Sequence, residues 1–103
     1  MRPDRDLKML KENADEAADF VRLLANKKRL LIFCKLTACR EMSVGPLADA
    51  VGLSRSALSQ HLAKLRDTGL VKTRRKSQSV FYRLSRDVRV RHTIFLLKQL
   101  FCR

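Results

Sequence analysis

Residues 43–69 read SVGPLADAVGLSRSALSQHLAKLRDTG and contain two short helical patterns that are separated by only a few residues. Ser43 and Ser54 each precede one of these patterns, and serine is among the preferred N-cap residues of helices. Gly52 and Gly69 follow the two patterns, where helices commonly end in the left-handed conformation that glycine tolerates best. The stretch therefore predicts two helices joined by a tight turn.

In the second predicted helix, Leu58, Leu62 and Leu65 form an apolar stripe, and the other faces are polar. A helix, a glycine-containing turn and a polar-faced second helix form a helix-turn-helix, here at about residues 43–68. The second helix of such a motif enters the major groove of DNA, where glutamine can pair with adenine. The predicted DNA-contacting residues here are Ser54, Arg55, Ser56, Ser59, Gln60, His61 and Lys64. A solvated helix face is the alternative explanation.

Residues 70–84 follow the second helix and predict a β-hairpin. Residues 70–75 alternate in polarity, residues 79–84 favour a strand, and residues 76–78 form a polar turn. A basic hairpin after a helix-turn-helix is a wing, whose cations lie along phosphates or in the adjacent minor groove. The predicted contacting residues are Arg74, Arg75, Lys76 and Gln78. Alternatively, one or two of these charges would protect a strand edge from aggregation.

Three further helices flank this region. The pattern at residues 6–25 gives a narrow apolar seam, that at residues 27–39 is apolar through its middle, and that at residues 87–101 has a wide apolar arc. The predicted order is ααααββα, a mainly α fold with a β-hairpin. We expect residues 1–103 to form one winged helix-turn-helix domain whose outer two helices are available to a second subunit.

The chain is strongly basic, with 23 Lys and Arg against 10 Asp and Glu and a formal net charge of +13. Basic residues concentrate between positions 72 and 91, which suits a polyanion such as nucleic acid. No stretch approaches the ~20 apolar residues that span a bilayer, and no face suits membrane-surface binding. The start lacks a signal-peptide pattern, so we expect a cytoplasmic protein. No nucleophile–base pair or phosphate loop points to an enzyme.

The runs ALSQHLAKLRDTGLV (residues 57–71) and VFYRL (residues 80–84), with Arg74 and Arg75 between them, resemble the ArsR/SmtB family of repressors. The resemblance extends over about residues 23–102. It implies a winged-helix homodimer joined through its first and last helices. It also implies that this homodimer binds a palindromic operator in double-stranded DNA and releases it when an inducer binds.

Many members of this family sense metals, but this sequence lacks both of the family's sites that we compared. The Cys-x-Cys pair at the start of the third helix would fall at residues 42–47, which contain no metal ligand. The site on the last helix uses Asp, His, His and Glu, whereas here only Asp87 and His92 occur, at a different spacing. We therefore predict no metal and no cofactor. A metal-responsive repressor with an atypical thiolate site stays an alternative.

Cys34, in LIFC, and Cys102, in LFC, resemble the matching cysteines of the branch that contains BigR, SqrR, YgaV and HlyU. The resemblance implies a dithiol switch, in which a persulfide or an oxidant links these two cysteines and derepresses transcription. The plain structural explanation is a buried core thiol at 34 and an ordinary tail residue at 102. Cys39 has no counterpart in the branch. A nonspecific architectural protein that binds DNA through charge alone is the remaining alternative.

Overall fold

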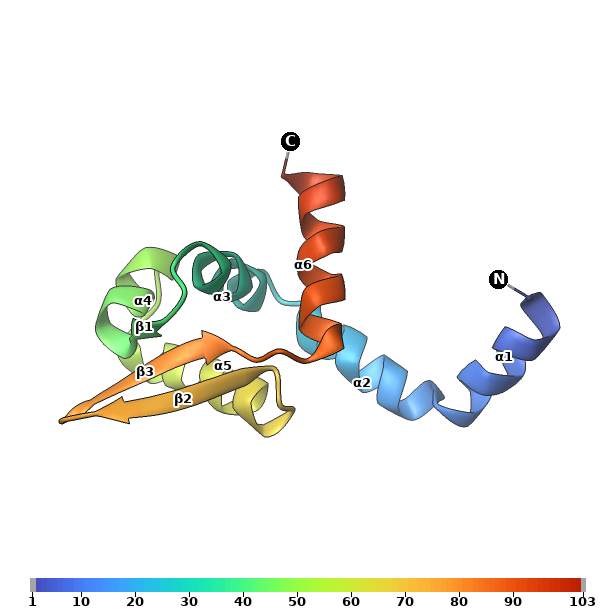
Figure 1. Cartoon of the computed structure of the whole chain (residues 1–103), viewed down its shortest axis with the longest axis horizontal. Coiled ribbons are helices and arrows are strands. Elements are labelled where there is room, and N and C mark those ends of the chain that lie inside the picture. Colours follow the sequence, from blue (N-terminus) through green and yellow to red (C-terminus); the bar gives the residue numbers. More distant parts are fainter. Residues whose placement is uncertain (1, 103) are drawn as a thin grey trace.

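The computed structural model describes residues 2–102, over which the chain forms six helices and three strands (Figure 1). The helices are α1 (Pro3–Glu12), α2 (Ala14–Leu24), α3 (Lys27–Ala38), α4 (Val44–Val51), α5 (Arg55–Asp67) and α6 (Val88–Phe101). The strands are β1 (Met42–Ser43), β2 (Val71–Lys76) and β3 (Ser79–Leu84). Helices α4 and α5, followed by the β2–β3 hairpin, confirm the predicted winged helix-turn-helix.

The turn between α4 and α5 forms as the sequence predicts. Gly52 ends α4 in the left-handed conformation with a φ of 71°, and the Leu53 N–H donates to the Ala48 carbonyl at 3.0 Å. Ser54 is the N-cap of α5, since its side-chain oxygen accepts a hydrogen bond from the Ala57 N–H at 3.1 Å. These local contacts fix the direction in which α5 leaves the turn.

The core lies between α3, α4, α5 and the base of the hairpin. Its buried apolar residues are Ile32, Phe33, Leu36, Leu47, Ala48, Val51, Leu58, Leu62, Leu65, Leu70, Val71 and Val90. The predicted leucine stripe of α5 is therefore in the core, and the opposite polar face of α5 remains outside. Burial of this apolar surface holds the two helices of the motif against the hairpin.

The sheet is antiparallel, with the strand order β1-β3-β2. Strand β1 was not predicted, because its two residues are too few to give a pattern; Ser43, its second residue, also occupies the N-cap position of α4. The hairpin register runs from Val71 opposite Leu84 to Lys76 opposite Ser79. The turn is therefore one residue shorter than predicted, and Lys76 belongs to β2.

The N-terminal segment differs from the single helix predicted at residues 6–25. The backbone leaves helical geometry at Asn13, where φ is −114° and ψ is 15°, so that α1 ends at Glu12 and α2 begins at Ala14. Asparagine competes with the helix for backbone groups, and here its Nδ2 donates to the Met9 carbonyl at 3.0 Å. Helices α1 and α2 extend away from the rest of the chain (Figure 1) and contain no buried residue.

Helix α6 rises from the end of the hairpin, and its far half stands clear of the core (Figure 1). Large apolar residues are exposed on both outer arms: Leu7, Met9, Leu10 and Val21 on α1 and α2, and Val88, Phe95, Leu96, Leu100 and Phe101 on α6. Within residues 2–102, no helix combines the length and the apolar character needed to cross a membrane.

Candidate nucleic-acid interface

Helix α5 holds most of its predicted DNA-contacting residues on its solvent-facing side. Because the leucine stripe packs into the core, these residues are exposed: Ser54, Arg55, Ser56, Ser59, Gln60 and Lys64. The N-terminal end of a helix also presents unpaired N–H groups and the positive end of the helix dipole, both of which favour a phosphate. The arrangement suits entry into a groove of DNA, and contact of each residue with DNA stays a prediction.

His61, the remaining predicted residue of this helix, is half-buried and contacts α3. Its Nδ1 accepts a hydrogen bond from the Arg29 Nε at 3.2 Å. Burial lowers the pKa of His61 below its ordinary value, and the charges of Arg29 and Lys64 lower it further. A neutral imidazole therefore lies beneath the exposed face of α5, where it helps to hold the helix against α3.

Arg29 is a structural residue that the sequence did not reveal. It is only 9% exposed, and its Nη1 donates to the Leu23 carbonyl at 3.1 Å while its Nε binds His61. Arg29 thus connects the end of α2 with α3 and α5. In the sequence it follows Lys27 and Lys28 and is indistinguishable from them, because its partners lie in other elements.

In the wing, the predicted cations divide between the two faces of the hairpin. Side chains alternate along a strand, so Arg74 and Lys76 lie on one face and Arg75 on the other. Arg75, Lys76 and Gln78 are exposed at or near the tip. Their contact with DNA stays a prediction.

Arg74 is engaged within the protein. It forms an ion pair with Glu41, and its guanidinium lies over the Phe81 ring, 5.4 Å from the centroid. The hydrogen bond from Arg74 lowers the pKa of Glu41, and the same contact raises the pKa of Arg74. Because this charge is already paired in the free protein, Arg74 must leave Glu41 to contribute fully to a DNA contact.

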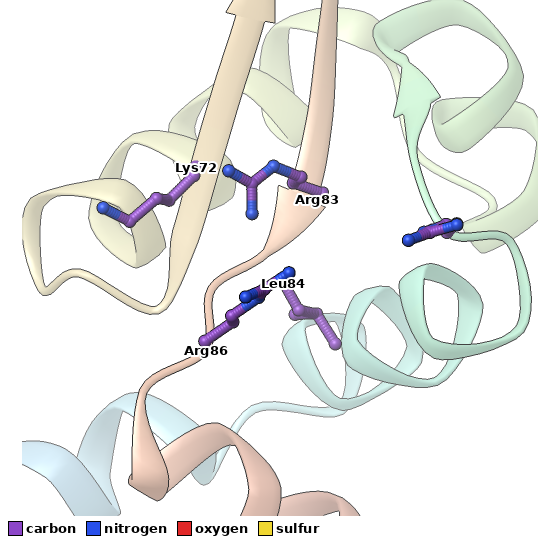
Figure 2. Close-up of a pocket in the computed structure, with 5 residues that line it drawn as sticks. Lys72, Arg83, Leu84 and Arg86 are labelled. Atoms are coloured by element: carbon purple, nitrogen blue, oxygen red, sulfur yellow. The ribbon is translucent and has the colours of Figure 1, made fainter.

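The basic surface continues to the base of the hairpin. There, side chains from separate segments surround a pocket of about 590 Å³ (Figure 2), which is lined by Arg40, Lys72, Arg83, Leu84 and Arg86. The sequence placed Lys72, Arg83 and Arg86 in one basic stretch. It gave no sign that Arg40, from the connection between α3 and β1, would join them.

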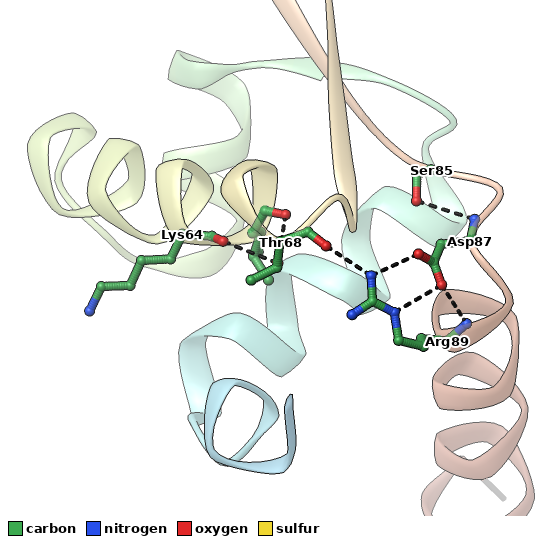
Figure 3. Close-up of polar contacts among 6 residues, drawn as sticks. Lys64, Thr68, Ser85, Asp87 and Arg89 are labelled. Atoms are coloured by element: carbon green, nitrogen blue, oxygen red, sulfur yellow. Dashed lines mark hydrogen bonds and ion pairs between the residues drawn. The ribbon is translucent and has the colours of Figure 1, made fainter. Parts of the chain in front are cut away.

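Arg89 joins the end of α5 to the start of α6 (Figure 3). Its Nη2 donates to the Thr68 carbonyl and to Asp87 Oδ2, both at 2.8 Å. Asp87 is the N-cap of α6 and accepts a hydrogen bond from the Arg89 N–H at 2.8 Å. Hydrogen bonds from Arg89 lower the pKa of Asp87 to about 2. The end of α5 is thereby fixed to the long C-terminal helix.

Cys34 and Cys102 line the same groove, although they lie far apart in the sequence. The groove has a volume of about 610 Å³, is mostly apolar and lies between α3 and α6. Both residues are exposed free thiols, so the explanation of Cys34 as a buried core thiol is wrong. Cys39 is half-buried and lies outside the groove lining. Over residues 2–102, no three His, Cys, Asp or Glu side chains are grouped to hold a metal ion.

Comparison with known proteins identifies the family. The family described as "Bacterial regulatory protein, arsR family" matches residues 26–73, from just before α3 into β2. Over 97 residues the chain is 45% identical to the transcriptional activator HlyU of Vibrio cholerae, covering 94% of this chain and 88% of that protein. The chain belongs to the arsR family of bacterial regulatory proteins.

This arsR-family regulator also resembles the HTH-type transcriptional regulator YgaV of Escherichia coli. The two are 38% identical over 97 residues, covering 94% of this chain and 97% of YgaV. The fold of this chain also matches solved structures of arsR-family regulators. Reduced HlyU from Vibrio cholerae gives a TM-score of 0.82 at 45% identity, covering 93% of this chain and 99% of HlyU. The repressor BigR from Xylella fastidiosa gives a TM-score of 0.78 at 33% identity, covering 93% of this chain and 96% of BigR.

Family membership makes the chain a DNA-binding transcriptional regulator and not an enzyme, as the sequence predicts. The named relatives include both an activator, HlyU, and a repressor, BigR.

Proposed function

We propose that this arsR-family regulator is a repressor that releases its operator when a sulfur bridge links Cys34 to Cys102. The inducer is a reactive sulfur species such as a persulfide, or an oxidant. The observation that carries this proposal is the shared groove between α3 and α6, which both cysteines line. Two relatives are consistent with it, since HlyU has been solved in a form described as reduced and BigR is described as a repressor.

The functional unit is a homodimer joined through α1, α2 and α6. These helices carry the large apolar residues that a single chain leaves exposed, and covering such surface favours association. A two-fold axis between the subunits places the two copies of α5 on one side of the DNA. The copies then meet successive major grooves about 34 Å apart, which a palindromic operator provides. The protein acts where that operator lies, in the cytoplasm.

On each half-site, α5 reads base edges and the wing tip holds the backbone. Gln60 is exposed and can pair with adenine through its side-chain amide, whereas Arg75 and Lys76 carry charge without a base-reading geometry. Replacing Gln60 by alanine should therefore relax specificity at one base pair, by about 1–3 kcal/mol. Lys76→Gln should weaken binding to all sequences alike. A nonspecific architectural protein would bind operator and unrelated DNA equally, which would contradict the proposal.

The proposed switch needs two thiols and one sulfane sulfur donor. The Cys34 thiolate attacks the outer sulfur of a persulfide RSSH, which gives a Cys34 persulfide and RSH. The Cys102 thiolate then attacks the inner sulfur of that persulfide, forming the Cys34–Cys102 disulfide and releasing hydrogen sulfide. The two thiols are oxidised by two electrons, and the persulfide is reduced. A peroxide would accept the same two electrons and form water.

The bridge would act on α5 through the two helices that carry the cysteines. Helix α3 holds α5 through the hydrogen bond from Arg29 to His61. Helix α6 holds α5 through the hydrogen bond from Arg89 to the Thr68 carbonyl (Figure 3). A covalent link between α3 and α6 therefore alters both supports of α5. A change in the spacing or tilt of the two copies of α5 lowers affinity for a rigid pair of half-sites.

The test compares operator binding before and after treatment with a persulfide donor. Wild-type protein should lose operator affinity on treatment, and mass spectrometry of the intact chain should show loss of two hydrogens, restored by a thiol reductant. The variants Cys34→Ser and Cys102→Ser should bind operator as the reduced protein does and should not respond. Cys39→Ser is the matched control, because Cys39 lies outside the groove, and it should respond as the wild type does.

Two results would contradict the proposal. If the treated wild type binds operator as tightly as the reduced protein, the bridge does not control DNA binding. If Cys34→Ser still responds, another group is the sensor. Transcription from the operator in vitro distinguishes a repressor from an activator. The reduced protein should lower transcript yield if it is a repressor and raise it if it is an activator.

A further inference from the structure

A cationic pocket at the base of the hairpin has no place in the function proposed above. It is lined by Arg40, Lys72, Arg83, Leu84 and Arg86, and we name it the basal pocket (Figure 2). The four cations come from separate segments: the connection between α3 and β1, the two strands of the hairpin, and the connection between β3 and α6. Folding therefore brings Arg40 together with three cations of the basic stretch at residues 72–86.

These charges are left without acidic partners. Of the ion pairs recorded for residues 2–102, none includes a residue of the basal pocket. The acid beside the pocket is Glu41, whose hydrogen bond goes to Arg74, although the charges of Arg83 and Arg40 also lower its pKa. Like charges held together in a concave site repel each other and attract anions from solution. An anionic ligand would relieve this repulsion.

The basal pocket lies at the end of the hairpin opposite the wing tip. In the hairpin register, Lys72 faces Arg83, and the adjacent pair, Val71 and Leu84, points toward the core. Lys72 and Arg83 are therefore on the sheet face opposite the core, the face that Arg74 and Lys76 also occupy nearer the tip. The tip of the hairpin, at Lys76, is four residues further along, or about 13 Å at ~3.3 Å per residue.

The volume and chemistry of the basal pocket indicate the class of ligand. A volume of about 590 Å³ lies within the range of small-molecule sites. Guanidinium groups bind phosphate oxygens in a bidentate manner, and a lysine adds a point charge.

We propose that the basal pocket binds a small anion with two or more phosphate groups, of the nucleoside diphosphate or triphosphate class. ADP is the probe, with AMP and adenosine as reference ligands, titrated calorimetrically into the full chain. Binding should be one ADP per chain, with an affinity at least about tenfold above that of AMP because a second phosphate adds charged hydrogen bonds. Adenosine should give no binding heat.

The test variant is Lys72→Gln/Arg83→Gln, and the control is Lys27→Gln/Lys35→Gln, which removes the same charge from α3, outside the pocket and outside the proposed dimer helices. The pocket variant should weaken ADP binding by about tenfold or more, and the control by no more than about twofold. Equal weakening in both variants would mean that ADP senses only net charge and would overturn the proposal. Absence of ADP binding at millimolar concentration would also overturn it.

Two further measurements keep the outcome clear. In wild-type protein, ADP should shift the backbone amide signals of residues 40, 72, 83 and 86 and leave those of the wing tip unchanged. Operator affinity without nucleotide should be alike in the pocket variant and the control. If the pocket variant loses about tenfold more operator affinity than the control, the cations serve the DNA backbone, and the small-anion proposal is wrong.

Discussion

Replacing Arg29 by methionine should destabilise the domain although no apolar core contact is removed. The Arg29 guanidinium donates to the Leu23 carbonyl at 3.1 Å and to His61 Nδ1 at 3.2 Å, and the residue is 9% exposed. Methionine keeps an unbranched apolar stem of similar length but has no donor. The substitution therefore leaves two shielded acceptors without partners.

The expected loss follows from these two bonds. A hydrogen bond to a charged group contributes about 1.5–3 kcal/mol, and an orphaned buried acceptor adds a desolvation penalty. Removal of the arginine also ends the burial of a charge, which offsets part of the loss. We expect the free energy of unfolding to fall by about 3 kcal/mol. At about 4–8 °C per kcal/mol for a domain of this size, Tm should fall by roughly 12–24 °C.

The assay is thermal unfolding followed by circular dichroism at one fixed protein concentration, because dimer stability depends on concentration. Lys27→Met is the control: Lys27 is exposed at the start of the same helix, and its loss should change stability by no more than about 0.5 kcal/mol. The pKa of His61, followed by NMR, should rise in Arg29→Met, since the Arg29 charge lowers it. Equal melting of the two variants, or an unmoved His61 pKa, would refute the reasoning.

Three further predictions concern α5 and its turn. Ser54→Ala should lower stability by about 1 kcal/mol through loss of the cap on the Ala57 N–H, and Ser54→Asp should retain most of it, as thermal unfolding will show. Gly52→Ala should cost about 1 kcal/mol or more, because its φ of 71° strains any L side chain; urea unfolding measures this. The pKa of His61 is lower in the folded protein than in the unfolded chain, so the unfolded chain binds more protons near that pKa. The free energy of unfolding should therefore decrease as pH falls through about 6.5. Urea unfolding at several pH values measures this slope, and His61→Gln should reduce it.

The parts of the fold that follow from local chemistry could be predicted from the sequence. Gly52, Ser54 and the leucine stripe of α5 each act over a few residues, and the structure has them as predicted. The break at Asn13 was missed because the apolar seam continues across it, and periodicity outweighed a single weak helix former. Strand β1 was missed because its two residues give no pattern and its pairing partner, β3, lies far along the chain.

The candidate site also contains features that could be predicted from the sequence and features that could not. The exposed face of α5 and the basic wing could be predicted, since exposure follows from the position of the apolar stripe. The pairing of Arg74 with Glu41 and the burial of Arg29 could not, because both depend on which elements fold together. The pairing of Cys34 with Cys102 was expected only from family resemblance, because no spacing rule relates residues of two different segments; the groove that both line is a finding of the structure.

The contacts that local patterns miss are also those that connect the parts of the molecule. Two arginines outside α5 hold it, Arg29 from α3 at His61 and Arg89 from α6 at the Thr68 carbonyl. Helix α5, which we propose reads DNA, is thus supported by α3, which carries Cys34, and by α6, which ends just before Cys102. In the proposed switch, a bridge between Cys34 and Cys102 would reach α5 through polar contacts at both its middle and its end. The proposed switch therefore needs no contact between the two cysteines and the face of α5 that is predicted to bind DNA.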